Sequence, residues 1–94
     1  MYFVYILSNK KNGTLYVGVT SNLVYRVLQH KNNAFSGFTA QYNVKKLVYY
    51  EVHSEITEAI KREKNIKKWR RAWKITLIER DNPQWNELPI KEYF

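Results

Sequence analysis

The sequence predicts an α+β fold, in which a small three-stranded antiparallel sheet is flanked by helices. Two patterns support this fold class. Along residues 2 to 8 and 14 to 19 the side-chain types alternate as they do in β-strands. Residues 22 to 31 and 54 to 69 instead have the apolar spacing of amphipathic helices. The predicted order is β-β-α-β-α-α, and 94 residues suffice for a single domain with one modest core.

The first two strands are predicted to form a hairpin. Asn12-Gly13 lies between them, and a type I′ turn needs positive φ at both central residues. A two-residue turn would pair residue 16 with residue 9. Tyr5, Tyr16 and Gly18 would then lie on one face of the sheet, because side chains alternate with period two. The first strand is apolar on both faces, so we expect it to be the central strand.

The later elements follow from turn and capping residues. Ser21 is predicted to cap the first helix, and residues 32 to 43 are predicted to form a loop. Leu47 to His53 is predicted to form the third strand, and the next helix is predicted to begin at Ser54.

The end of the chain is predicted to be helical and then to fold back. Residues 72 to 80 either extend the preceding helix or follow a bend near residues 69 to 71, and Asp81-Asn82-Pro83 ends this helix. The core then covers about residues 2 to 80. The tail, residues 81 to 94, should pack back on the body through Trp85, Leu88, Ile90, Tyr93 and Phe94.

The net charge of +8 favours a polyanionic partner, most often a nucleic acid. A basic solubilising surface is the alternative, and an anionic membrane is a weaker one. No apolar run approaches the roughly 20 residues of a membrane helix, and the start of the chain lacks the basic leader of a signal peptide. Cysteine is absent, which excludes disulfides and thiolate zinc sites. We therefore expect a cytoplasmic protein without a membrane role.

Glu63 is an acid in an unexpected position. It falls within the apolar stripe formed by Ile56, Ala59, Ile60 and Ile66. A buried charge is costly unless it is paired or bound to a metal. Glu63 is therefore either a metal ligand or a member of a structural ion pair with Arg26 or another cation.

Four further residues could act with Glu63. Tyr5 and Tyr16 share a predicted face, although core packing could explain either one alone. Arg26 and His30 are four residues apart on the first helix, so they are neighbours on one side of it. An ordinary surface arginine and histidine are the alternative.

These residue types suit phosphodiester hydrolysis. The reaction needs a base for water and a cation for the developing charge. Arginine binds phosphate through its forked donors, and an acid can hold a divalent ion such as Mg²⁺. A tyrosine needs nearby positive charge to act as a base, because its reference pKa is about 10.

The sequence resembles the GIY-YIG nuclease family. Phe3-Val4-Tyr5 and Tyr16-Val17-Gly18 stand where the family has Gly-Ile-Tyr and Tyr-Ile-Gly, with Phe3 in place of the first glycine. Arg26, His30 and Glu63 follow in the order of its helix motifs. The resemblance spans about residues 2 to 80 and is greatest to small stand-alone members related to the incision-subunit domain of nucleotide excision repair.

The resemblance implies that one divalent metal ion, Mg²⁺ or Mn²⁺, is bound by Glu63 and that one DNA strand is cleaved per site. One tyrosine serves as the base or positions the water, and we favour Tyr5. Asn86, in Pro83-Gln84-Trp85-Asn86, resembles a late asparagine of the family, although it lies further from Glu63 than the family pattern suggests.

We therefore predict a metal-dependent DNA endonuclease, directed by DNA structure or a protein partner, in DNA repair or processing. RNA is not excluded as the substrate. One alternative is a nucleic-acid-binding module that does not cleave, and another is an interaction protein that uses its exposed aromatics. Backbone phosphates should contact the eight basic residues between positions 61 and 74: Lys61, Arg62, Lys64, Lys67, Lys68, Arg70, Arg71 and Lys74.

Overall fold

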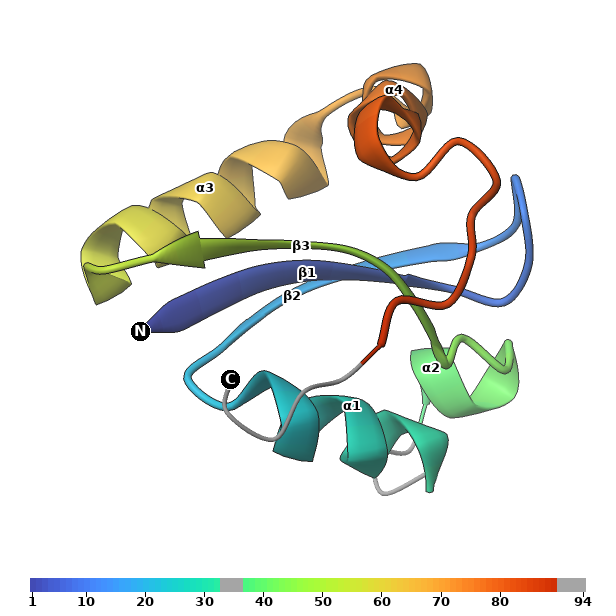
Figure 1. Ribbon diagram of the computed structural model, residues 1–94, viewed down its shortest axis with the longest axis horizontal. Coiled ribbons are helices and arrows are strands. Elements are labelled where there is room, and N and C mark those ends of the chain that lie inside the picture. Colours follow the sequence, from blue (N-terminus) through green and yellow to red (C-terminus); the bar gives the residue numbers. More distant parts are fainter. Residues whose placement is uncertain (33–36, 90–94) are drawn as a thin grey trace.

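The computed structural model of the chain describes residues 1–32 and 37–89. It confirms the predicted fold class: three strands form one antiparallel sheet with the order β2-β1-β3, and helices cover it (Figure 1). The strands are β1 (Tyr2–Ser8), β2 (Leu15–Thr20) and β3 (Lys46–His53), and the helices are α1 (Leu23–Lys31), α2 (Phe38–Gln41), α3 (Ile56–Lys68) and α4 (Arg71–Asp81).

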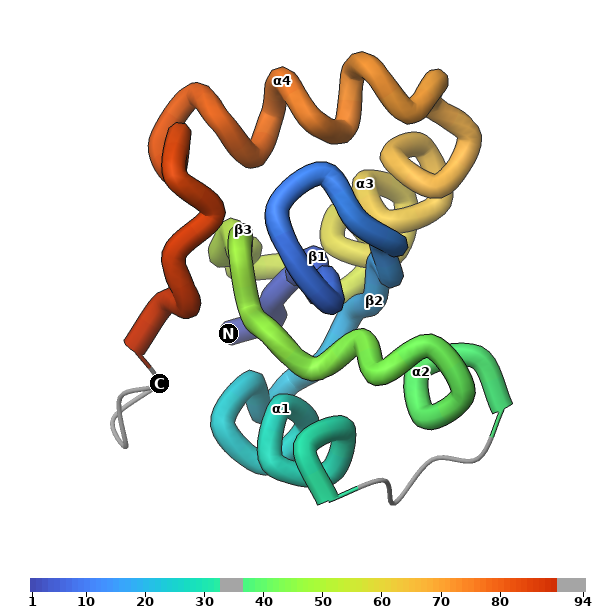
Figure 2. The backbone as a smooth tube through the Cα atoms, turned by 90° about the vertical axis from the view of Figure 1, so that its right-hand side faces the viewer, coloured from blue at the N-terminus to red at the C-terminus, as the bar shows by residue number. Residues whose placement is uncertain are grey.

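Strand β1 is central, as predicted, and both of its faces are buried. On one face Tyr5 packs in a cluster with Val27 of α1. On the other face Ile6 packs with Ile66 of α3 and Ile78 of α4. The sheet therefore separates a layer with α1 and α2 from a layer with α3 and α4 (Figure 2).

The hairpin differs from its prediction. Tyr16 pairs with Leu7 rather than with residue 9, so residues 9 to 14 form the connection. Within it, Asn9 Oδ1 accepts a hydrogen bond from the Thr14 amide at 2.9 Å, and Asn12 takes a positive φ of 58°. The two-residue turn was wrong because the Asn9 side chain stabilises a longer loop. The shift is by two residues, so every side chain keeps its predicted face.

Two predicted helix starts were also wrong. Asn22, not Ser21, caps α1, because its Oδ1 accepts a hydrogen bond from the Tyr25 amide at 3.0 Å. Helix α3 begins at Ile56 rather than after Ser54, without a side-chain capping bond.

Part of the predicted loop over residues 32 to 43 is helical. Gly37 has φ 91°, a conformation that suits glycine, and it precedes the four residues of α2. Residues 33 to 36 of this predicted loop lie outside the described residues.

A break separates α3 from α4. Trp69 and Arg70 have extended backbones, with ψ of 153° and 148°, so the two helices are separate. The Arg71 Nη2 atom donates hydrogen bonds to the carbonyl oxygens of Asn12 and Gly13, at 2.7 and 2.5 Å, which fastens the start of α4 to the hairpin. None of the helices in the described parts of the chain is long and apolar enough to cross a membrane.

The segment after α4 passes along the β3 edge (Figure 2). Asn82 ends α4, and its Nδ2 donates to the Val48 carbonyl at 3.0 Å. Trp85 is fully buried, and the Leu88 amide donates to the Leu47 carbonyl at 2.8 Å. The predicted contacts of residues 90, 93 and 94 lie outside the described residues.

A polar network joins β3 to α3. The Glu51 carboxylate accepts hydrogen bonds from Tyr49 at 2.5 Å and from Arg62 at 3.0 Å, and it lies 2.6 Å from His53 Nε2. Burial alone would raise the pKa of Glu51, but these three partners outweigh it and hold the pKa below its usual range.

Replacing Glu51 by Gln is expected to lower the free energy of unfolding by about 1 to 3 kcal/mol, the cost of leaving buried polar partners unsatisfied. A lowered pKa in the folded state stabilises the protein above the unfolded pKa of about 4.3, and this contribution is lost as the pH falls through the folded pKa. Chemical denaturation between neutral and acidic pH measures it. The variant should lose less stability on acidification than the wild type, whereas the exposed Glu55→Gln control should behave as wild type.

Candidate nuclease site

Tyr5 and Gly18 form the centre of the candidate site. They are paired on neighbouring strands, and the Tyr5 ring lies across the glycine. A Cβ atom on Gly18 would come within 2.5 Å of both Cζ and the hydroxyl oxygen of Tyr5. Gly18 is therefore required here because any side chain would displace the tyrosine ring.

His30 connects this tyrosine to α1 and α2. Its Nε2 lies 3.2 Å from the Tyr5 hydroxyl oxygen, and its Nδ1 lies 3.3 Å from Oγ1 of Thr39. His30 is only 3% exposed. Burial and then the positive charge of Arg26 lower its pKa, so the imidazole is neutral at neutral pH. The neutral ring can accept a proton at one nitrogen while donating at the other.

Tyr16 completes an aromatic triangle. Its ring centroid lies 5.2 Å from that of His30 and 6.3 Å from that of Tyr5. The shared face predicted for the two tyrosines is thus confirmed in spite of the changed register.

Arg26 is half-buried on α1, one turn before His30. It borders a hollow of about 270 Å³ together with Ile56 and Ile60 of α3. Arg26 therefore lies where β2, α1 and α3 meet. The hollow itself was not predicted, since no sequence pattern links α1 to the exposed side of α3.

Glu63 approaches from α3, and its side chain is 12% exposed. Its burial was predicted, but the stripe around it was partly wrong: Ile56 and Ile60 are 47% and 37% exposed, while Ala59 and Ile66 are buried. Glu63 Oε2 forms an ion pair with Lys67 Nζ at 2.8 Å, one helical turn away. This contact matches the alternative in which another cation pairs with Glu63, and the metal-ligand role stays a prediction.

Electrostatics link Glu63 and Arg26 to Tyr5. Burial raises the pKa of Tyr5 above its usual range, Tyr16 and Glu63 add to this effect, and Arg26 opposes it. The positive charge that a tyrosine base needs is thus present in Arg26, but the effect of burial on this pKa is larger. Tyr5 is therefore a protonated phenol that points at a neutral imidazole.

Among the described residues, Asn86 makes no hydrogen bond to this cluster, and its place in the site stays a prediction. Its backbone is bound to Asn82, which is anchored to β3 by its side chain. Gly18 lies on β2, at the opposite edge of the sheet. The family-like Pro-Gln-Trp-Asn ending instead contributes Trp85 to the core.

The eight basic residues predicted to contact DNA fall into three groups. Arg62, Lys67, Arg71 and Lys74 have partners within the protein, namely Glu51, Glu63, the hairpin carbonyls and the Lys67 carbonyl. Arg70 lies over the Trp73 ring. Three exposed lysines border a hollow on the outer side of α3: Lys61, Lys64 and Lys68.

Gly18→Ala is expected to lower the free energy of unfolding by about 1 to 3 kcal/mol, the usual cost of overpacking a core, because the new methyl group overlaps the Tyr5 ring. It should also lower any cleavage rate by displacing the hydroxyl group. Thermal unfolding and a nicking assay measure the two effects.

Gly13→Ala is the matched control for this substitution. Its Cβ would overlap Oδ1 of Asn9, so it should also cost stability, but it lies in the hairpin loop. Loss of cleavage is expected for Gly18→Ala alone. Equal losses of cleavage in the two variants would mean that Gly18 matters only for folding.

The family model of the GIY-YIG catalytic domain matches residues 1–76. The chain belongs to the GIY-YIG family, whose enzymes are endonucleases that act on DNA and generally depend on a divalent metal ion. This assignment confirms the resemblance drawn from Tyr5, Tyr16 and Glu63.

Among relatives, the chain is similar to UPF0213 proteins. It is 41% identical over 78 residues to one from Clostridium perfringens, a match that covers 83% of each chain. It is 35% identical over 78 residues to one from Staphylococcus epidermidis, covering 83% of this chain and 94% of the relative. The solution NMR structure of a UPF0213 protein from Bacillus halodurans superposes with a TM-score of 0.57 at 25% identity, covering 93% of both chains.

Proposed function

We propose that the protein is a divalent-metal-dependent DNA endonuclease, directed by DNA structure or a protein partner, in DNA repair or processing. The observation that carries the proposal is that Tyr5 lies within hydrogen-bonding distance of His30 and is coupled electrostatically to both Arg26 and the Glu63 carboxylate. Binding alone would not require an acid that faces a phosphate.

The donor set fits Mg²⁺ or Mn²⁺. Glu63 is the carboxylate that would hold the ion, and its partner Lys67 is 50% exposed and can move into solvent. The described residues contain no group of three His, Asp or Glu side chains around one point. Mg²⁺ is typically held by one or two carboxylates, water and substrate phosphate. When bound, it would supply Lewis-acid polarisation of the phosphoryl oxygens.

Arg26 is suited to stabilise charge on the phosphate. It lies on α1, where its charge opposes the raised pKa of Tyr5, and it is half-buried, so its electrostatic effect is less screened than that of a surface arginine. Its forked donors match two phosphate oxygens. We assign it to the developing negative charge rather than to general DNA affinity.

Tyr5 and His30 are suited to move a proton. We assign the ring hydrogen of His30 to Nδ1, where it is donated to Thr39, so that Nε2 accepts the hydrogen of Tyr5. A water that attacks phosphorus can then lose its proton to the Tyr5 oxygen as the tyrosine proton passes to His30. This shared transfer avoids a free phenolate, which the raised pKa of Tyr5 disfavours.

The outer side of α3 is the proposed path of the DNA backbone. Lys61, Lys64 and Lys68 follow a helical spacing along one side of α3, and Ile60 borders both their hollow and the hollow beside Arg26. Such contacts give affinity without sequence information.

Removing Lys64 and Lys68 together, as Lys→Gln, is expected to reduce the slope of log affinity against log salt by up to about 1.8 for duplex DNA, or 0.9 for each phosphate that the protein no longer neutralises. Fluorescence anisotropy across a salt series measures the slope. The double variant Lys10→Gln, Lys11→Gln changes two exposed lysines of the hairpin loop and serves as control. Equal changes in both double variants would place the DNA path elsewhere.

A non-catalytic binding module is the second candidate, and the Glu63–Lys67 ion pair favours it, since this pair satisfies the acid without a metal. Incubating wild-type protein with closed circular, flapped and branched DNA in Mg²⁺ or Mn²⁺ separates the two. We expect metal-dependent single-strand nicks, fastest on the preferred structure. Tight binding without nicks on every substrate would instead support the module.

A further inference from the structure

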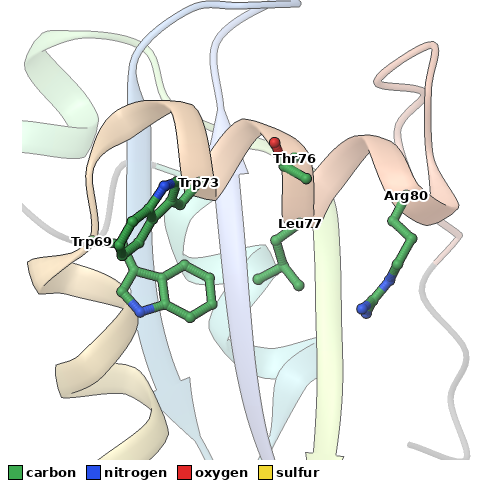
Figure 3. A pocket seen from close by; sticks show the side chains of 5 residues that line it. All are labelled: Trp69, Trp73, Thr76, Leu77 and Arg80. Atoms are coloured by element: carbon green, nitrogen blue, oxygen red, sulfur yellow. The ribbon is translucent and has the colours of Figure 1, made fainter.

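A hollow on the α4 side of the molecule lies apart from the candidate nuclease site. It has a volume of about 370 Å³ and is bordered by Trp69, Trp73, Leu77 and Arg80, with Thr76 at its rim (Figure 3). The volume is in the range of small-ligand sites, roughly 300 to 1,000 Å³. The tryptophans lie at one end and Arg80 at the other (Figure 3).

The two indoles form an aromatic corner. Their centroids are 6.3 Å apart and their planes meet at 77°. Trp69 packs against the core, which holds the corner in place, whereas Trp73 is 54% exposed. A large exposed indole on a fixed support offers stacking area at little cost in conformational entropy.

Positive charge surrounds this corner. The Arg70 guanidinium lies 5.6 Å from the Trp73 ring centroid, and that of Arg62 lies 5.1 Å from the Trp69 ring centroid. Arg80 borders the hollow directly, and its 3.8 Å contact with Asp81 is exposed on both sides and therefore weak. The described lining contains no acidic side chain.

We propose that this hollow binds an unpaired nucleobase of a single-stranded DNA segment, by stacking on Trp73 with the adjoining phosphates near Arg70 and Arg80. Aromatic platforms flanked by cations are the usual means of holding single strands without reading their sequence. The hollow differs from the lysine row of Lys61, Lys64 and Lys68, which has no aromatic lining and suits backbone phosphates alone.

The proposal goes beyond cleavage, since base stacking needs neither the metal ion nor Glu63. It would give the protein a preference for DNA with an unpaired strand. An apolar peptide segment is the competing occupant, but a hollow bordered by Arg80 and flanked by Arg70 complements a polyanion better than a neutral chain.

The test compares two single-stranded ligands of equal length, oligothymidine and an abasic oligomer with the same number of phosphates. Binding is measured by anisotropy in chelator, so that no cleavage occurs. Trp73→Ala should weaken oligothymidine binding at least about fivefold, the lower end of what one base stacked on an aromatic ring contributes. It should leave abasic binding unchanged, and Trp73→Phe should retain most of the affinity because it keeps a ring.

Phe38→Ala is the matched control, because Phe38 is a similarly exposed aromatic side chain on α2. It should bind oligothymidine as the wild type does. Unchanged oligothymidine binding by Trp73→Ala, or an equal loss on both oligomers, would overturn the proposal.

Intrinsic fluorescence gives a second, independent readout on soluble wild-type protein. Oligothymidine should quench tryptophan emission in the wild type and less in Trp73→Phe, since Trp85 is fully buried and Trp69 is partly buried against the core. Equal quenching in the two proteins would also contradict stacking on Trp73. None of these outcomes depends on nuclease activity, so failure here is distinguishable from failure of the proposed function.

Discussion

Tyr5→Phe is expected to slow DNA cleavage by about 10² to 10⁴, the usual range for losing a proton-transfer group. The substitution keeps the ring that packs across Gly18 and removes only the hydroxyl, which lies 3.2 Å from His30 Nε2. Single-turnover nicking at saturating protein isolates the chemical step. Duplex affinity should stay unchanged, because the hydroxyl is buried away from the lysine row.

Tyr16→Phe is the natural comparison, because it makes the same chemical change in the neighbouring ring. Tyr16 packs its ring against the imidazole of His30, with the two centroids 5.2 Å apart, and Tyr16→Phe keeps this contact. We expect its cleavage to be impaired, but less than that of Tyr5→Phe. Near-normal cleavage by the double variant, with the fold intact, would exclude a tyrosine mechanism and favour His30 as the base.

Glu63→Gln is expected to abolish cleavage while DNA binding stays intact or becomes slightly tighter. The amide keeps the size of the side chain but removes the negative charge that would hold a divalent ion. Loss of that charge also removes repulsion of the phosphate. Nicking of closed circular DNA and anisotropy with an uncleaved duplex measure the two effects on one preparation.

Glu58→Gln is the matched control, since Glu58 lies on the same helix and is exposed. It should cleave as the wild type does. A purely structural Glu63 would behave differently from a metal ligand: breaking its ion pair with Lys67 would lower the melting temperature, and activity below that temperature would be retained.

Much of the fold follows from periodicity alone. Alternation placed Tyr5 and Tyr16 on one face, and this survived a wrong hairpin register because the error was by two residues. The central position of β1 followed from its two apolar faces. The loop could not be predicted, because it depends on the Asn9 side chain binding the Thr14 amide, a contact that no propensity specifies.

The features of the candidate site that depend on a single helix could be predicted from the sequence. The spacing of Arg26 and His30 gave a shared side of α1, and the position of Glu63 in α3 gave its burial. Thr39 was missed because it meets His30 only through the tertiary fold. Neither the residue type of Thr39 nor its position in the sequence indicated that it would contact His30.

Charge on α3 and α4 was harder to interpret from sequence. From the sequence, all eight basic residues between positions 61 and 74 were equally good candidates for DNA contacts. In the structure, however, Arg62 binds Glu51 and Arg71 binds the hairpin. These partners are distant along the chain, so composition could give the net charge but not its distribution. The same limit applies to Ile56 and Ile60, which have core-like spacing but border an exposed hollow beside Arg26.

The most direct test of the nuclease assignment is the nicking rate of closed circular DNA as a function of Mg²⁺ concentration, with wild type and Glu63→Gln measured side by side. We expect the wild-type rate to rise to saturation and to vanish in chelator, while the variant remains at background at every concentration. Superimposable curves for the two proteins, or a wild type that never nicks DNA at any Mg²⁺ concentration, would contradict metal-dependent cleavage through Glu63.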